Sequence, residues 1–126
     1  MQKIKVIELF AGIGGFRIPL QELGGKCVFS SEFNHHAQRS YELNFGEVPF
    51  GDITKLNINI VPKHNVLCAG FPCQPFSQAG YKKGFSEKLE DRGNMFFVIR
   101  DIIAEKRPDA IFLENVRHLI QKATKW

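Results

Sequence analysis

The sequence predicts an α/β protein built on a doubly wound, mostly parallel sheet. Short apolar runs typical of buried strands alternate along the 126 residues with segments of helical periodicity. That alternation is typical of parallel strands joined by right-handed crossovers, with helices covering both faces of the sheet. A chain of this length can form one domain with a hydrophobic core.

The expected strands are short apolar runs, and the expected helices lie between them. Strands are predicted at residues 4–10, 26–30, 48–50, 66–69 and 110–113. Helices are predicted at residues 16–23, 36–44 and 94–106, the second closed by Gly46 and the third stopped by Pro108. Residues 78–91 lack clear periodicity, and their place beside a cysteine favours a mobile lid over a solvated surface loop.

A glycine-rich turn follows the first strand and opens the first helix. Gly12, Gly14 and Gly15 let the backbone approach a ligand, and the helix N-terminus offers free N–H donors. The dinucleotide fingerprint G-x-G-x-x-G fits poorly, because its third glycine would fall on Arg17. The turn alone is a modest signal, since many glycine-rich turns bind nothing.

Acidic residues follow the next two expected strands. Glu32 comes after the strand at 26–30, where a carboxylate can hold ribose hydroxyls. Asp52 comes after the run at 48–50, where it can accept a hydrogen bond from an adenine amino group. Each can also be a solvated surface charge, but three polar features at successive strand ends favour a nucleoside ligand.

A cysteine stands between two prolines in the segment Gly70-Phe71-Pro72-Cys73-Gln74-Pro75-Phe76-Ser77. Each proline fixes its own φ and restricts the residue before it, so Cys73 lies on a stiffened turn after the strand at 66–69. Open α/β sheets bind their ligands at this edge. A thiol in that place suits nucleophilic chemistry better than core packing.

Composition gives weaker indications about partners and compartment. The net charge of +4 and the pI near 9.1 permit a polyanionic partner such as nucleic acid without requiring one. Three cysteines and the lack of a signal-peptide pattern favour a cytoplasmic protein with free thiols, and no apolar run is long enough for a membrane span. No metal site is expected, because His64, Cys68 and Cys73 match no standard zinc spacing.

Six segments together resemble the DNA (cytosine-5) methyltransferases, and they follow the family's order. They are ELFAGIGGF at 8–16, SEF at 31–33, GDI at 51–53, GFPCQPFS at 70–77, RGNMFF at 92–97 and ENV at 114–116. A Pro-Cys-Gln motif with a downstream Glu-Asn-Val is highly specific. The resemblance covers most of the chain and implies the Rossmann-like fold of S-adenosylmethionine-dependent methyltransferases.

The resemblance implies that the cofactor is S-adenosylmethionine, which leaves as S-adenosylhomocysteine. The glycine turn should cradle the methionine moiety, Glu32 should bind the ribose, and two phenylalanines should pack near the adenine. The implied cofactor-binding residues are Phe10, Ala11, Gly12, Ile13, Gly14, Gly15, Glu32, Phe33, Asp52, Ile53, Gly70, Pro72 and Met95.

The resemblance also implies Cys73, Glu114 and Asn115 as catalytic residues. The Cys73 thiolate would add to carbon 6 of cytosine, which makes carbon 5 nucleophilic toward the donor methyl group. Glu114 would be protonated near N3 of the ring, and Asn115 would brace the cysteine turn. The target base must leave the duplex to reach the thiolate. Expected DNA contacts are Gln74, Ser77, Lys82, Lys83 and Arg92.

The motifs that follow Glu-Asn-Val in the family are missing, among them its target-recognition region. The resemblance therefore implies that residues 1–126 are the N-terminal portion of a catalytic domain, with a sheet incomplete at its C-terminal side. The expected partners are a complementing C-terminal subunit or region and double-stranded DNA with a flipped cytosine. Two alternatives are a non-catalytic S-adenosylmethionine-binding remnant and a tRNA cytosine-5 methyltransferase, although the chain keeps the DNA-type Pro-Cys-Gln-Pro.

Overall fold

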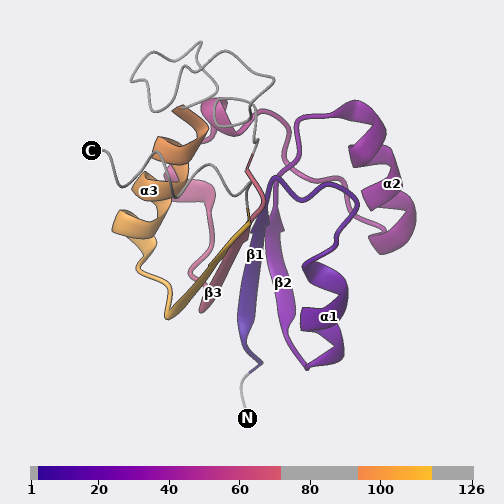
Figure 1. Ribbon diagram of the computed structural model, residues 1–126, viewed down its shortest axis with the longest axis horizontal. Coiled ribbons are helices and arrows are strands. Elements are labelled where there is room, and N and C mark those ends of the chain that lie inside the picture. Colours follow the sequence, from indigo (N-terminus) through magenta and orange to yellow (C-terminus); the bar gives the residue numbers. More distant parts are fainter. Residues whose placement is uncertain (1–2, 72–93, 115–126) are drawn as a thin grey trace.

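The computed structural model describes residues 3–71 and 94–114, and these ranges contain a four-stranded parallel sheet (Figure 1). Its strands are β1 (Lys5–Leu9), β2 (Lys26–Ser30), β3 (Val66–Ala69) and β4 (Ala110–Leu113). They lie in the order β2-β1-β3-β4, so β1 and β3 form the centre of the sheet. The predicted fold class is confirmed, and three of the predicted strands have the predicted bounds.

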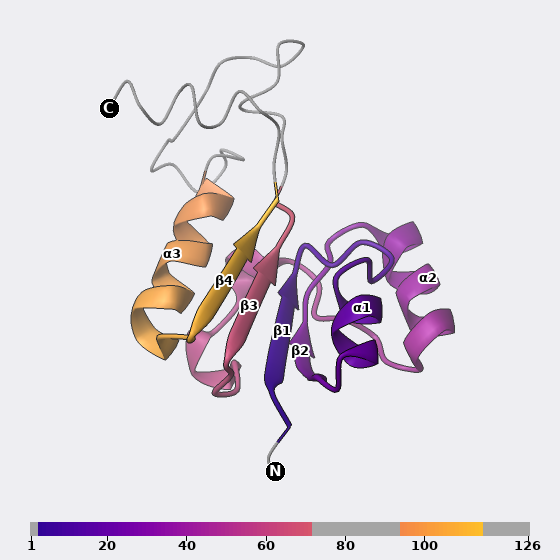
Figure 2. The ribbon, with the colours of Figure 1, turned by 60° about the horizontal axis from the view of Figure 1, so that its bottom comes forward.

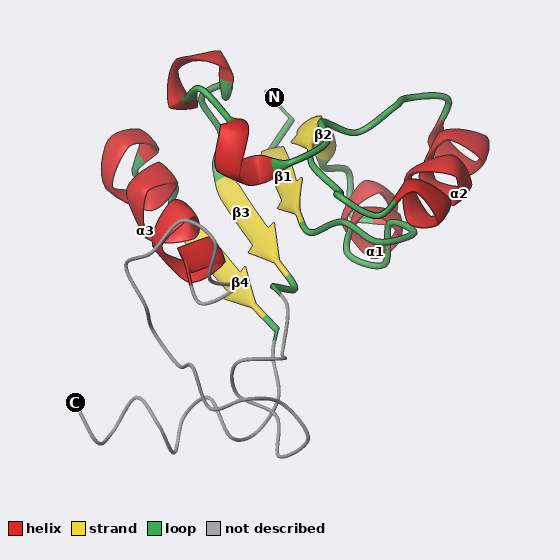
Figure 3. Ribbon diagram, turned by 90° about the horizontal axis from the view of Figure 1, so that it is seen from above, coloured by secondary structure: helices red, strands yellow, loops and turns green. Residues whose placement is uncertain are grey.

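Helices cover both faces of this sheet. The helices are α1 (Arg17–Glu22), α2 (His35–Phe45) and α3 (Asn94–Lys106). The sheet runs between α3 on one side and α1 with α2 on the other (Figures 2 and 3). Buried residues of β1 and β3, among them Ile7 and Leu67, pack with Ile99 and Ile102 of α3 to form the core. Within the described residues, no helix is long and apolar enough to cross a bilayer.

The bounds of α2 follow from its two caps. The side chain of Asn34 accepts hydrogen bonds from the N–H groups of His36 and Ala37, which fixes the N-terminus. Gly46 ends the helix in the left-handed conformation, with φ at 71°, and donates its N–H to the carbonyl of Glu42. The predicted closure at Gly46 is confirmed, and the helix is one residue longer at each end than the 36–44 prediction.

The predicted strand at 48–50 is wrong. Only Phe50 pairs with the sheet, through an isolated parallel bridge to Ser31. Pro49 has no N–H to donate, so the segment cannot extend into a regular ladder. The chain then forms two short 3-10 helices, η1 (Ile53–Lys55) and η2 (Ile58–Ile60), which are capped by the side chains of Asp52 and Asn57.

Strand β4 departs from the expectation that all strands are covered on both faces. Its residues Ile111, Phe112 and Leu113 remain 41%, 53% and 45% exposed. β4 pairs with β3 on one side and is the last strand in the described sheet. An apolar edge strand with this exposure is uncommon in a native protein unless another segment covers it.

Candidate functional site

A pocket of about 280 Å³ lies where β1, β2 and β3 end. The chain leaves β1 toward β2 on one side, while β3 lies on the other, so the pocket stands at the switch point of the strand order. Its volume is near the lower end of the range for small-molecule sites. The lining residues are Phe10, Ser31, Glu32, Phe33, Asn34, Gly51, Asp52, Ile53, Gly70 and Met95.

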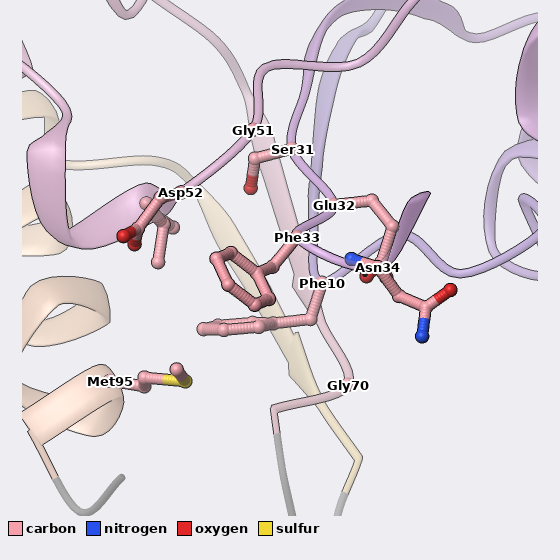
Figure 4. Close-up of a pocket in the computed structure, with 10 residues that line it drawn as sticks. Phe10, Ser31, Glu32, Phe33, Asn34, Gly51, Asp52, Gly70 and Met95 are labelled. Carbon is pink, nitrogen blue, oxygen red and sulfur yellow. Dashed lines mark hydrogen bonds between the residues drawn. The ribbon is translucent and has the colours of Figure 1, made fainter. Parts of the chain in front are cut away.

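Apolar side chains form one part of the pocket wall. Phe10, Phe33 and Met95 of α3 all line the pocket, and Figure 4 shows the Met95 side chain directed toward Phe10. Phe10 has a left-handed backbone with φ at 53°, a conformation that is uncommon for a residue with a β-carbon. Strain of this kind concentrates at binding sites. Two flat rings and a thioether can accommodate a planar aromatic group.

The Glu32 carboxylate is held in place by backbone donors. One oxygen accepts from the N–H of Gly12 at 2.8 Å, and the other accepts from the N–H of Asn34 at 2.8 Å. Gln38 of α2 also donates its side-chain amide to the Glu32 carbonyl. Each carboxylate oxygen retains further acceptor capacity, so the group can take hydroxyl donors from a ligand without rearranging.

Asp52 presents a second carboxylate at the pocket. One of its oxygens accepts hydrogen bonds from the hydroxyl and the N–H of Thr54, at 2.6 and 2.9 Å. The hydrogen bond from the Thr54 hydroxyl is the main reason why the pKa of Asp52 lies below its usual value, and the bond from the N–H adds to the effect. The group therefore stays an acceptor at neutral pH, and it suits a ligand N–H or O–H.

The glycines of the turn after β1 have different surroundings. A β-carbon added at Gly12 or Gly15 would meet nothing within 4 Å, whereas one at Gly14 would lie 2.1 Å from the ring of Phe45. Gly14 is thus required by the packing of α2, and Gly12 and Gly15 leave an open backbone surface. Gly12 links the turn to the pocket through Glu32. The lining includes none of the predicted residues Ala11, Gly12, Ile13, Gly14 and Gly15.

A buried carboxylate of β1 holds the far end of the turn. Glu8 is fully buried, and one of its oxygens accepts from the N–H of Phe16 at 3.1 Å. Its other oxygen lies 3.5 Å from the hydroxyl of Tyr41. Burial raises the pKa of Glu8, and the hydrogen bonds from the backbone oppose that rise. Burial also raises the pKa of Tyr41 to about 12, so its hydroxyl stays protonated at neutral pH.

Arg17 ties the first turn of α1 to the end of α2. Its guanidinium donates to the Tyr41 hydroxyl at 3.0 Å and to both oxygens of Glu47 at 2.9 and 3.2 Å. The same group lies 4.5 Å from the centre of the Phe45 ring. Sequence analysis did not identify this network. The spacing of Tyr41 and Phe45, four residues apart on one helix, was the signal for a buried aromatic face.

Glu114 lies at the same edge of the sheet as the pocket. Its N–H donates to the carbonyl of Ala69 at 2.9 Å, and its carboxylate would be 3.3 Å from a β-carbon added at Gly70. This places Glu114 beside the residue that begins the Pro-Cys-Gln segment. The other predicted catalytic, cofactor and DNA contacts lie outside the described residues, namely Pro72, Cys73, Gln74, Ser77, Lys82, Lys83, Arg92 and Asn115.

The two cysteines within the described ranges, Cys27 and Cys68, form no disulfide and are not poised for reaction. Cys68 is fully buried in β3, and burial raises its pKa to about 11. Burial raises the pKa of Cys27 as well. Both are therefore protonated thiols at neutral pH. In this part of the chain, no group of three or more His, Cys, Asp or Glu side chains could hold a metal ion.

Comparison with known proteins gives a consistent result. The chain is 58% identical over 118 residues to the Type II methyltransferase M.DsaV of Dactylococcopsis salina, covering 94% of this chain and 33% of that protein. It is 50% identical over 115 residues to the Type II methyltransferase M.HhaI of Haemophilus parahaemolyticus, covering 91% and 34%. The chain thus spans about a third of the length of these relatives.

A solved structure and a family profile agree with these relatives. The crystal structure of the S. pombe Dnmt2 methyltransferase superposes with a TM-score of 0.75 at 26% identity, covering 98% of this chain and 39% of that one. Residues 4–125 match the profile of the C-5 cytosine-specific DNA methylases. With nearly its whole length matched, the chain belongs to the C-5 cytosine-specific DNA methylase family.

Proposed function

We propose that this chain binds S-adenosylmethionine in the pocket and supplies the nucleophile for methylation of cytosine at carbon 5 in DNA. The observation that carries the proposal is the pocket at the switch point, which is lined by two carboxylates and two aromatic rings and is linked to the glycine turn through the Gly12–Glu32 hydrogen bond. Because the chain spans about a third of its relatives, the complete activity requires a complementing C-terminal subunit or region.

The pocket residues fit the nucleoside half of this cofactor. Phe10 and Phe33 pack against the adenine, the Asp52 carboxylate accepts from its amino group, and Glu32 accepts from the ribose hydroxyls. The turn from Ala11 to Gly15 takes the methionine moiety. Ile53, Gly70, Pro72 and Met95 complete the wall of the site. When bound, S-adenosylmethionine supplies an electrophilic methyl group on a sulfonium.

The chemistry on cytosine is carried by residues that follow β3 and β4 in the sequence. The Cys73 sulfur bonds to carbon 6 of the flipped base, which gives carbon 5 the electron density to attack the methyl group. Glu114 donates a hydrogen bond or proton at N3 as that density develops, and Asn115 holds the cysteine turn. Loss of the carbon 5 proton then releases the sulfur. Gln74, Ser77, Lys82, Lys83 and Arg92 contact the DNA.

Calorimetric titration of the chain with S-adenosylhomocysteine tests the cofactor site without DNA. Glu32→Gln is expected to weaken binding at least tenfold, because the amide loses acceptor capacity toward the ribose and disturbs the Gly12 contact. Glu42→Gln, an exposed substitution on the neighbouring helix α2, is the control and should bind normally. Absence of binding by the unaltered chain would overturn the proposed site.

Trapping on DNA that carries 5-fluorocytosine tests the chemistry. With S-adenosylmethionine and a C-terminal region from a relative such as M.DsaV, a covalent adduct is expected that disappears in Cys73→Ala and persists in Cys27→Ser. The chain alone should give little adduct. Robust methylation by the purified chain alone would contradict the need for a complementing region.

A further inference from the structure

The hydroxyl of Ser31 is a buried polar group without a hydrogen-bond partner in the described part of the chain. Ser31 is only 1% exposed, yet it lines the pocket. Figure 4 shows its oxygen turned toward the side of the pocket where Asp52 and Phe33 lie. Buried hydroxyls in native proteins are nearly always paired, because an unpaired one lowers stability. A partner that arrives with a ligand accounts for this exception.

The backbone of Ser31 is fixed on both sides, so the residue cannot turn away from the pocket. Its N–H donates to the carbonyl of Glu8 at 3.0 Å, and its carbonyl accepts from the N–H of Ala11 at 2.8 Å. It also forms the parallel bridge with Phe50. Only rotation about the Cα–Cβ and C–O bonds is left to the hydroxyl, which is the preorganisation that a binding group needs.

The hydroxyl also supplies a chemical function that its neighbours lack. Among the described side chains of the lining, the carboxylates of Glu32 and Asp52 accept hydrogen bonds, and the apolar residues neither donate nor accept them. The side-chain oxygen of Asn34 caps α2, and its nitrogen points away from the rings in Figure 4. Ser31 is therefore the side-chain donor available to an acceptor atom of the ligand in this part of the pocket.

We propose that the Ser31 hydroxyl donates a hydrogen bond to a ring nitrogen of the cofactor adenine. The adenine amino group and the ribose hydroxyls are hydrogen-bond donors, and the two carboxylates accept from them. The ring nitrogens of adenine are acceptors and require a donor. Phe33, which is 64% exposed, moves aside or restacks to admit the purine to the hydroxyl. The inference rests on the proposed function, because it deepens the assignment of the same pocket.

The adjacent serine provides a matched control. Ser30 is also buried, but successive residues of a strand face opposite sides of the sheet, and its side chain interacts with the Tyr41 hydroxyl. The two neighbouring positions therefore carry the same buried hydroxyl on opposite sides of the sheet, one beside Tyr41 and the other without a hydrogen-bond partner within the described residues.

Titration with S-adenosylhomocysteine and thermal unfolding of the full chain separate the two serines. Ser31→Ala is expected to weaken binding about fivefold to tenfold while the Tm stays unchanged or rises, because the substitution removes an unpaired hydroxyl. Ser30→Ala is expected to lower the Tm and leave the affinity unchanged. A structural role for Ser31 would give the opposite result, a lower Tm with normal affinity.

Deaza analogues of S-adenosylhomocysteine identify the contacted atom. One of the 1-, 3- and 7-deaza analogues should bind the unaltered chain as weakly as it binds Ser31→Ala, because that analogue lacks the acceptor. If each analogue weakens both proteins by the same factor, or if Ser31→Ala binds normally, the inference is overturned and the proposed function stands. If the unaltered chain fails to bind S-adenosylhomocysteine, both are overturned.

Discussion

At the scale of single residues, the two neighbouring glycines of the turn have separable roles. Gly14→Ala should lower the Tm, because its φ of 96° disfavours a side chain and the new methyl group would lie 2.1 Å from the Phe45 ring. Gly15→Ala should leave the Tm unchanged or slightly higher, since nothing lies within 4 Å. Its affinity for S-adenosylhomocysteine should fall, because the methyl group occupies space proposed for the ligand. Thermal unfolding and calorimetry measure both, and equal Tm losses would contradict this distinction.

His64 gives the chain a defined dependence of stability on pH. The residue is buried, and its Nδ1 donates to the carbonyl of Pro62 at 2.8 Å, so Nε2 is the atom that a proton would reach. Burial lowers the pKa of His64, and Lys106 adds to the shift. The unfolded chain therefore binds a proton more readily, and the unfolding free energy should fall as the pH drops below about 6.5.

Denaturant titration between pH 7.5 and pH 5 checks this expectation. His64→Asn, which keeps a donor toward Pro62, should lose part of the decline in unfolding free energy. His36→Asn is the control, because His36 is exposed at the start of α2. A decline that is the same in the His64 variant and in the unaltered chain would contradict the assignment.

At the scale of elements, α2 connects the two sides of the candidate site. Its N-terminal cap contacts Glu32, and its last turn packs under the glycine turn through Phe45. Phe45→Ala should lower the unfolding free energy by about 2 kcal/mol, because the ring is partly buried, and should also weaken cofactor binding. Leu43→Ala is the control, since Leu43 is 79% exposed on the same helix.

A double-mutant cycle measures the connection directly. The combined Gly14→Ala and Phe45→Ala variant should lose less stability than the sum of the single variants, because removing the ring makes room for the new methyl group. Denaturant unfolding of the four proteins gives the coupling free energy. Additive losses would show that the ring and the turn do not interact.

Elements with strong local signals were predictable, and elements set by tertiary contacts were not. The bounds of β3 and α3 could be predicted because apolar runs and a stopping proline mark them. The strand prediction at 48–50 failed because only Phe50 of this run pairs with the sheet. η1 and η2 follow a capping Asp or Asn, a signal that the sequence analysis did not use.

The candidate site was predicted to the extent that it depends on strand ends. Glu32 could be placed at the pocket because it follows the end of β2, whereas Asp52 follows the isolated bridge of Phe50 to Ser31 and not the predicted strand. Contacts between distant segments determine the strand order, the hydrogen bond from Gly12 to Glu32 and the burial of the unpaired Ser31 hydroxyl. No local pattern in the sequence specifies such contacts.

At the scale of the whole molecule, the exposed face and edge of β4 are the expected contact for the complementing region. Hydrogen exchange of the β4 amides should slow when a C-terminal region from a relative such as M.DsaV is added, because a new neighbour would protect them. β1, already paired on both sides, is the internal control. Methylation that recovers on mixing while β4 exchange is unchanged would place the contact elsewhere.

The pairing of β1 with β3 also governs how the chain acquires its structure. The N–H of Lys5 meets the side chain of Asn65 across 60 positions of sequence, and no hairpin can nucleate a sheet whose strands are all parallel. Closing so long a loop slows folding. During synthesis, the edge of β1 that pairs with β3 stays unpaired until β3 has left the ribosome. A chaperone that shields this edge would matter most during that interval.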